Sequence, residues 1–195
     1  MIKFMLVLAS ASPRRKELLT QVNCKFTARP SNAPELSFKD EPNPEKLVME
    51  NAKLKATASV LPQNKDEIVL GFDTLVYHNG KIFGKPKDDE EAFAMLKNLS
   101  GDTHQVYTGV ALIYKDKIYQ DFAKTDVTMQ NLTDGEIWRY IKTGEPKGKA
   151  GAYAIQGIAS VFITKIMGCY SNVVGLPLNC LYNLAKKADI NLWEQ

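Results

Sequence analysis

The stretch EIVLGFDTLVYHNGKIFGKP, residues 67–86, decides which kind of sheet this chain builds. Its apolar run Ile68–Leu70 predicts a buried strand, which ends in a carboxylate at Asp73. Asn79 and Gly80 then give a strong hairpin signal between LVYH and KIFG, because both residues tolerate the positive φ angles of a type I′ turn. A hairpin pairs its strands antiparallel, so the stretch favours a mixed sheet over a purely parallel one.

Helices and strands alternate on both sides of this stretch, without internal repeats or low-complexity linkers. The elements predicted before it are a strand at Phe4–Ala9, a helix at 13–22 with Ser12 as its N-cap, and a helix from Pro44 to about Val60. Those predicted after it are a helix from Asp88 to Leu99 with Gly101 as its C-cap, two strands within 104–128, and a helix that begins with a capping box of Thr133 and Glu136 and ends at Gly144. A strand at 152–166 and a helix at 176–190 follow. We therefore expect an α/β fold, with residues 1–195 forming a single domain around a mixed, twisted β-sheet flanked by helices.

Composition and charge disfavour several classes of function. The 195 residues carry a net charge of +3 and are 45% apolar, so no bulk charge calls for nucleic acid or a membrane surface. The N-terminal apolar run is too short to span a bilayer, and two arginines follow it where a signal peptide has a small-residue cleavage site. Cys24, Cys169 and Cys180 lack metal-ligand spacing and are expected to be buried free thiols. These features predict a cytoplasmic protein.

Arg14 and Arg15 lie in the first turn of a helix that directly follows a buried strand. The amides of such a turn are unpaired and its dipole end is positive, so the position suits a phosphate group. Cations there mildly disfavour the helix itself, which indicates that another requirement selects them. The alternative is a solvated basic helix start, and this stretch alone does not decide between the two.

Three further side chains are poorly explained by packing. Lys55 lies on the inward stripe of its helix, so it either snorkels to the rim or points into a cleft. Asp73 ends a strand, where carboxylates of α/β proteins bind metal or act as a base, although a turn or capping role also places acids there. Glu35 is the conspicuous acid of the polar loop at 28–43.

The remaining polar candidates lie in turns or strands. Lys85 and Lys149 stand in turns framed by Gly and Pro, where the backbone can approach a ligand and lysine supplies a charge for phosphate. Gln156 interrupts a predicted apolar strand, and its amide can pair with a base edge or with the backbone. His78 and His104 lack a metal-ligand partner at helical spacing and are expected to be structural. Cations and a few acids beside turns suit a compact polyanion held with a divalent metal, and suit extended DNA poorly.

Four blocks of the sequence, in order, resemble the Maf family of nucleoside triphosphate pyrophosphatases over roughly residues 5–185. They are LASASPRRKELL, NAKLKA, GFDTLVYHNGKIFGKPKDDEEAFAMLKNLSGDTHQVYTGVAL and GEPKGKAGAYAIQGIASVFITKIMGCYSNVVGLPL. SPRR, DT and KAGAYAIQG resemble the dTTP/UTP branch, whereas the 7-methyl-GTP branch has a tryptophan in place of Arg14 and an acid in place of Gln156. Family members often carry two adjacent acids in the loop after the first helix, but this loop reads SNAPEL and offers only Glu35.

The resemblance implies a role for each candidate side chain. Asp73 would be the catalytic proton acceptor and, together with Glu35, would hold a divalent metal cation, Mg²⁺ or Mn²⁺. The residues implied to bind the triphosphate are Ser10, Arg15, Lys55 and Lys85, and those implied to set base specificity are Arg14, Thr74 and Gln156.

The same resemblance implies a two-lobed fold with a central substrate cleft, and a homodimer. No nucleic-acid or membrane partner is expected, because the net charge is near neutral. The implied reaction is hydrolysis of dTTP and UTP between the α- and β-phosphates, with modified pyrimidine nucleotides as a further candidate substrate. Three alternatives stay open: a nucleotide-sensing regulator of cell division with little turnover, a pyrophosphatase of different base specificity such as 7-methyl-GTP, and a nucleic-acid-binding protein, which the near-neutral charge disfavours.

Overall fold

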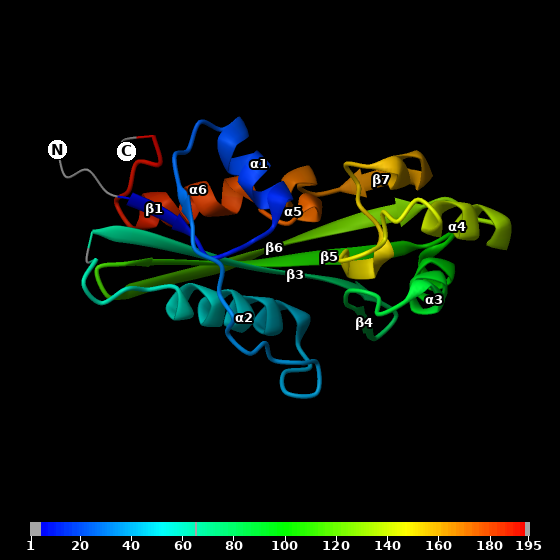
Figure 1. Cartoon of the computed structure of the whole chain (residues 1–195), viewed down its shortest axis with the longest axis horizontal. Coiled ribbons are helices and arrows are strands. Elements are labelled where there is room, and N and C mark those ends of the chain that lie inside the picture. Colours follow the sequence, from blue (N-terminus) through cyan, green and yellow to red (C-terminus); the bar gives the residue numbers. More distant parts are fainter. Residues whose placement is uncertain (1–4, 65, 194–195) are drawn as a thin grey trace. The chain divides into compact units, whose positions relative to one another are not determined.

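A computed structural model of the chain describes residues 5–64 and 66–193, and its helices alternate with strands (Figure 1). The strands are β1 (Met5–Leu8), β2 (Thr27–Ala28), β3 (Glu67–His78), β4 (Lys81–Phe83), β5 (Thr103–Tyr114), β6 (Lys117–Met129) and β7 (Ile163–Met167). The helices are α1 (Pro13–Gln21), α2 (Pro44–Ala58), α3 (Asp89–Leu99), α4 (Asp134–Ile141), α5 (Tyr170–Val174) and α6 (Leu178–Lys187), with 3₁₀ turns at Ala150–Ala152 and Ile158–Phe162. Phe4, the first residue of the predicted N-terminal strand, lies outside the described residues.

The strands form a mixed sheet in the order β2-β1-β3-β5-β6-β7, and β4 pairs with β3 outside this path. β1 is parallel to β2 and β3, whereas β4 is antiparallel to β3 and β7 is antiparallel to β6. Asn79 and Gly80 have φ angles of 48° and 78°, as a type I′ turn requires, and His78 pairs with Lys81 across them. The predicted hairpin and the mixed α/β sheet are therefore confirmed.

The chain divides into two compact units, and β3 passes from one to the other. The first unit contains the described residues up to Asp73, Thr108–Ala123 and those from Gly175 onwards; the second contains Thr74–Tyr107 and Lys124–Val174. The prediction that a strand ends at Asp73 is wrong, because β3 continues without a break to His78. Asp73 is thus a mid-strand residue, which is possible only if its buried carboxylate has partners.

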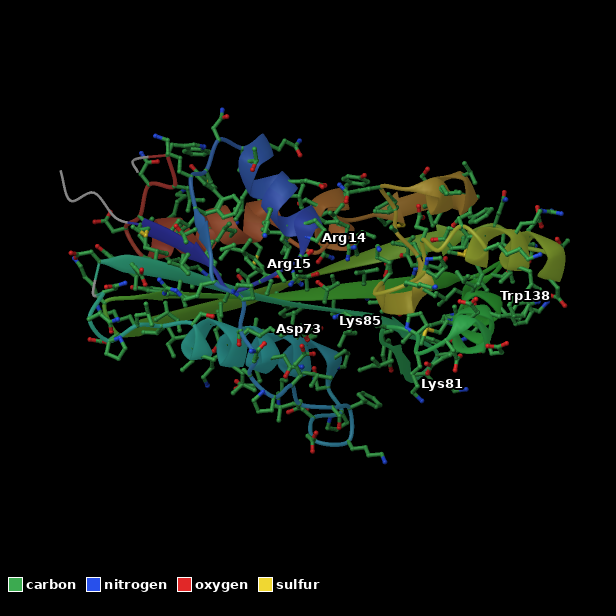
Figure 2. All side chains as sticks on the ribbon, in the orientation of Figure 1. Arg14, Arg15, Asp73, Lys81, Lys85 and Trp138 are labelled. Carbon is green, nitrogen blue, oxygen red and sulfur yellow. The ribbon has the colours of Figure 1, made fainter. Side chains whose placement is uncertain are left out.

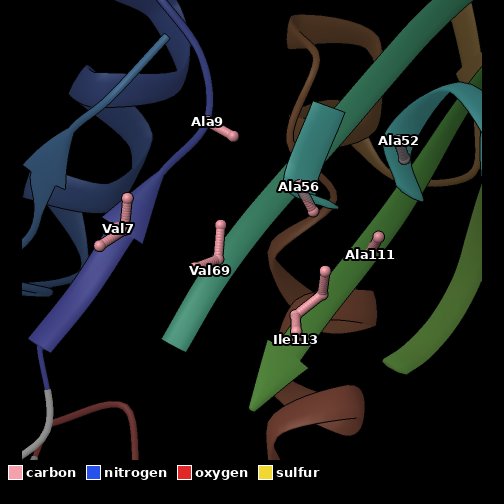
Figure 3. Close-up of a cluster of buried hydrophobic side chains, with 7 residues drawn as sticks. All are labelled: Val7, Ala9, Ala52, Ala56, Val69, Ala111 and Ile113. Carbon is pink, nitrogen blue, oxygen red and sulfur yellow. The ribbon is translucent and has the colours of Figure 1, made fainter. Parts of the chain in front are cut away.

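Within the first unit, α2 covers one face of the strands, and α1 and α6 lie on the other face (Figure 1). As predicted, α2 begins after Asn43, whose side chain accepts the N–H groups of Glu45 and Lys46. The apolar side chains shared by α2, β1, β3 and β5 form one buried cluster (Figure 3), namely Val7, Ala9, Ala52, Ala56, Val69, Ala111 and Ile113. The alanines of α2 let the helix backbone approach the sheet closely.

Within the second unit, local signals mark the helix ends. The predicted capping box of Thr133 and Glu136 is present at the start of α4. The ring of Phe93 on α3 stacks on Trp138 of α4, with 4.8 Å between the ring centroids. The C-cap of α3 is Ser100 rather than the predicted Gly101, which follows it with a φ of 76°.

The strand predicted at 152–166 is wrong for most of its length, because only β7 is a strand there. The carboxylate of Glu145 accepts the N–H of Ile158 at 2.7 Å and that of Ala159 at 3.1 Å. It also accepts the hydroxyl of Tyr140 at 2.8 Å. Two amides that a strand would offer to its neighbour are therefore bound to a side chain, and the backbone forms a 3₁₀ turn instead. Gln156 lies in the exposed turn before it.

Two general expectations concern the membrane and the thiols. Within the described part of the chain, no helix combines the length and the apolar character that crossing a bilayer requires. Cys24, Cys169 and Cys180 are all free, as expected, but only Cys24 is buried. Burial raises the pKa of the Cys24 thiol, which keeps it protonated at neutral pH.

His104 makes the stability of the second unit depend on pH. Its side chain is fully buried; Nε2 lies 2.7 Å from the Tyr153 hydroxyl, and Nδ1 finds no partner among the described residues. The pKa of His104 is lowered from 6.5 to about 4, mainly by burial and also by His78, while Asp102 opposes both effects. The unfolded chain therefore takes up a proton below pH 6.5 that the folded chain refuses until about pH 4. The contribution of neutral His104 to stability is fully present above pH 6.5, and it is lost as the pH falls from 6.5 to about 4.

We expect the free energy of unfolding to fall by roughly 2–3 kcal/mol between pH 7 and pH 4 because of His104 alone. His104→Gln removes the titrating group but keeps a polar partner for Tyr153, so it should flatten this dependence. Urea unfolding at pH 7, 5.5 and 4.5 measures it. His78→Gln is an informative comparison, because it removes a neighbour that lowers the pKa of His104 and should therefore narrow the pH window without abolishing it. An unchanged pH dependence in His104→Gln would contradict the assignment.

Candidate active site

The turn between β1 and α1 carries the first group of predicted site residues. Ser10 is buried there, and its Oγ accepts the N–H of Ser12 at 3.2 Å and Nη1 of Arg15 at 3.1 Å. Pro13 begins α1, where no N–H donor is needed. Ser12 occupies the predicted N-cap position, but its side chain makes no capping bond. Ser10, two residues earlier, links the turn to Arg15, because its Oγ accepts hydrogen bonds from both.

Arg15 is held rigidly by contacts within the first unit. Its Nε donates to the carbonyl of Gly175 at 2.8 Å, and its guanidinium lies over the Phe72 ring, 5.7 Å from the centroid. Burial lowers the pKa of Arg15 to about 10, while the nearby charge of Asp73 raises it. A guanidinium with this pKa is fully protonated at neutral pH, so a permanent cation faces the carboxylate.

Arg14 lies next to it at the start of α1, as Figure 2 shows. Burial lowers the pKa of Arg14, and Glu17 partly opposes this. Two half-buried cations therefore stand in the first turn of one helix. Placing two cations side by side in a half-buried turn costs free energy, because they lose solvation and repel each other. This cost favours the interpretation that an anion binds there over that of a solvated basic helix start.

Asp73 is a buried carboxylate with both oxygens engaged. Oδ1 accepts a hydrogen bond from Nζ of Lys55 at 2.6 Å, and Oδ2 accepts one from Nδ2 of Asn51 at 3.2 Å. Asn51 and Lys55 are four residues apart on α2, so both side chains leave the same face of the helix. These partners explain how a charged residue is tolerated in the middle of an otherwise apolar strand.

Asn51 also anchors the loop that carries Glu35. Its Oδ1 accepts the N–H of Leu36 at 2.7 Å, and its Nδ2 donates to the carbonyl of Leu36 at 3.1 Å. The adjacent Glu35 then reaches Lys55, with 2.8 Å between Oε1 and Nζ. The side chains of Glu35 and Asp73 are 54% and 11% exposed, so Lys55 joins a solvated carboxylate to a buried one.

The first unit thus gathers predicted residues from four separate segments, namely Ser10, Arg15, Glu35, Lys55 and Asp73. Cations of this kind can bind phosphate oxygens, and the carboxylates can take up a proton or hold a hard metal ion. Within residues 5–64 and 66–193, no group of three or more His, Cys, Asp or Glu side chains is placed to bind a metal.

The other predicted residues belong to the second unit. Thr74 is half-buried and directly follows Asp73 on β3, and Lys85 is exposed in the loop after β4. Gln156 is exposed in its turn, and Lys149 stands just before the first 3₁₀ turn. Figure 2 labels Lys85 beside its own loop. The roles given to these residues stay predictions.

Asn51 is the site residue that the sequence reasoning missed. It is almost fully buried and makes three hydrogen bonds, to Asp73 and to both backbone groups of Leu36. A usable signal was present: an amide one helical turn before Lys55, among apolar residues, must find partners in the interior. Its function as an anchor between loop and strand could only be seen in three dimensions.

Comparison with known proteins adds an independent finding. A family profile described as Maf-like protein matches residues 5–188. The chain is similar to a protein from Clostridium tetani named dTTP/UTP pyrophosphatase, 44% identical over 95% of this chain and 98% of the relative. Proteins of the same name from Caldicellulosiruptor saccharolyticus and Clostridium perfringens are 48% and 43% identical, each over 95% of this chain and over 96% and 98% of their own lengths.

Proposed function

The chain belongs to the Maf-like protein family, and from this premise we propose that it is a nucleoside triphosphate pyrophosphatase acting on dTTP and UTP. Support comes from relatives at 43–48% identity that bear this activity as their name and align along nearly the whole chain. The observation that carries the proposal is the setting of Asp73, a buried carboxylate that is held by Lys55 and Asn51 and whose charge raises the pKa of Arg15.

In the proposed reaction, water attacks a phosphorus of the α–β anhydride and its proton passes to the carboxylate of Asp73. The bond from that phosphorus to the bridging oxygen breaks, and the nucleoside monophosphate and pyrophosphate leave. Arg15 and Lys55 stabilise the negative charge that develops on the phosphate oxygens, because fixed cations in a partly desolvated site need no reorganisation. Ser10 supports this by keeping the guanidinium of Arg15 in place.

The donor set of the site fits a divalent metal cation, Mg²⁺ or Mn²⁺. Two carboxylate oxygens, one from Glu35 and one from Asp73, already converge on a single cationic nitrogen. Hard cations prefer such oxygens and commonly use one or two carboxylates together with substrate phosphates. When bound, the metal supplies charge neutralisation of the phosphates and orientation of the attacking water. Glu35 and Asp73 are the residues that would hold it.

Base recognition belongs, in this proposal, to Arg14, Thr74 and Gln156, and Lys85 adds a charge for the triphosphate. These four assignments rest on the family resemblance. A homodimer is an expectation of the same kind. A cytoplasmic location and the lack of nucleic-acid or membrane partners are expectations that rest on the charge, the N-terminal run and the cysteines of the sequence.

A nucleotide panel tests the proposal. Purified protein is incubated with Mg²⁺ or Mn²⁺ and each of dTTP, UTP, CTP, GTP and 7-methyl-GTP, and released pyrophosphate and orthophosphate are measured separately. We expect pyrophosphate from dTTP and UTP. Orthophosphate alone would place the cleavage elsewhere in the triphosphate, and binding without turnover would favour the nucleotide-sensing alternative. A preference for 7-methyl-GTP would overturn the base specificity but keep the reaction.

Gln156→Glu tests the specificity assignment separately. Thymine and uracil present the same O4 acceptor and N3–H donor, which an amide can pair with at two points. A carboxylate lacks the N–H₂ donor, so we expect kcat/KM for dTTP and UTP to fall by about tenfold or more, with the values for CTP and GTP much less affected. Gln130→Glu is the matched control, because Gln130 is also exposed in the second unit. Unchanged ratios among the four nucleotides would remove Gln156 from base recognition.

A further inference from the structure

Lys55 occupies the position that a metal ion would need. Its Nζ lies 2.6 Å from Oδ1 of Asp73 and 2.8 Å from Oε1 of Glu35. A divalent ion held by the same two oxygens would sit about 2.0–2.6 Å from each of them, which is the volume that the ammonium group fills. Lysine and metal cannot both be there, because of overlap and because two cations a few ångströms apart repel strongly.

The other contacts around Lys55 are compatible with its replacement by a metal ion between Glu35 and Asp73. Asn51 holds Oδ2 of Asp73 and both backbone groups of Leu36, so the Asp73 carboxylate and the backbone beside Glu35 keep these bonds if Lys55 leaves. Both ion pairs of Lys55 are made by its terminal nitrogen, which lies at the end of a flexible four-carbon chain. A change of rotamer can therefore give this nitrogen another anionic partner while Asn51 keeps its own bonds.

We propose that Lys55 is an internal counter-ion that holds the metal position in the nucleotide-free protein and leaves it for the phosphates when a nucleoside triphosphate binds. Metal binding and nucleotide binding then support each other, because the triphosphate offers Lys55 another anionic partner and so frees the two carboxylates. The inference rests on the proposed function and adds an order of binding: metal together with nucleotide, not before it.

The test measures binding of Mn²⁺ alone, by electron paramagnetic resonance of the free ion, in the absence of nucleotide. The wild-type protein should bind Mn²⁺ weakly at this site. Lys55→Met keeps the length of the side chain and removes its charge, so we expect Mn²⁺ to bind about tenfold more tightly or better, within the usual range of 5–150-fold for coupled sites. Lys53→Met is the matched control, since Lys53 lies on the same helix and pairs with Glu50, at 3.3 Å. Its Mn²⁺ affinity should equal that of the wild type.

Two further variants keep the result decisive. Lys55→Gln replaces Lys55→Met if the latter does not fold, as judged by its melting temperature. Adding Asp73→Asn to either variant should abolish the gain, which assigns the bound ion to this carboxylate pair. Equal or weaker Mn²⁺ binding in the Lys55 variants, or a gain that survives Asp73→Asn, would overturn the proposal. Hydrolysis of dTTP by the wild-type protein is measured independently, so failure of the exchange and failure of the proposed function are separate outcomes.

Discussion

Asp73→Asn should lower kcat for dTTP by about 10³-fold or more while the protein stays folded. The substitution removes the proposed proton acceptor, which general acid–base catalysis values at about 10²–10⁴-fold. It also removes one of the two carboxylates that would hold the metal, so the losses add on a logarithmic scale. The fold should survive, because an asparagine has the same shape and its Oδ1 can still accept from Nδ2 of Asn51.

The measurement is pyrophosphate release from dTTP and UTP, with the melting temperature determined in parallel. Asp66→Asn is the matched control, because Asp66 is exposed just before β3 and should not affect the rate. A rate close to the wild-type value in Asp73→Asn would show that the proton goes elsewhere. A strong fall in melting temperature would instead indicate that the charge is needed to balance Lys55 in the folded protein.

Most of the fold could be predicted because its signals are local. Asn43 caps α2, the pair Thr133 and Glu136 caps α4, and Asn79-Gly80 closes a type I′ turn. Each of these motifs satisfies backbone groups within a few residues of itself, so the flanking sequence is enough to identify it. The mixed character of the sheet followed from the hairpin alone.

The errors arise where a side chain distant in sequence decides the backbone conformation. The apolar segment 152–166 has the composition of a strand, but Glu145 takes the amides of Ile158 and Ala159. Nothing within the segment reveals that a carboxylate outside it will do so. Asp73 is the opposite case, since a charged residue that looked like a strand end is held inside β3 by two side chains of α2.

The candidate site was predictable as a set of residue types but not as a geometry. An arginine pair after a strand, an inward lysine and a carboxylate among apolar residues are each anomalous without a ligand. Their convergence depends on how closely α2 approaches the sheet, which is controlled by glycines that carry no chemistry of their own. A Cβ on Gly71 of β3 would lie 2.1 Å from the carbonyl oxygen of Ala52, and one on Gly109 of β5 would lie 2.2 Å from that of Val48.

Gly71→Ala is therefore expected to damage both stability and activity although the residue touches no substrate. The added methyl would also lie 2.8 Å from the backbone nitrogen of Ala56, so backbone, rather than a flexible side chain, must give way. We expect the free energy of unfolding to fall by roughly 3 kcal/mol or more, at the upper end for overpacking. Since α2 carries Asn51 and Lys55, its displacement should also lengthen both contacts to Asp73, and misplacement by about 1 Å typically costs about 10²-fold in rate.

Gly84→Ala separates this effect from a general cost of replacing glycine. A Cβ at Gly84 would meet nothing within 4 Å, so its unfolding free energy should stay within about 0.5 kcal/mol of the wild-type value. Urea unfolding and dTTP turnover at a temperature where both variants are folded give the two readouts. If Gly71→Ala loses stability but keeps its rate, the positions of Asn51 and Lys55 do not depend on how closely α2 packs on the sheet. If it keeps both, the close approach of helix and sheet at Gly71 is not what builds the site, and the carboxylate would have to be positioned by the loop of Glu35 instead.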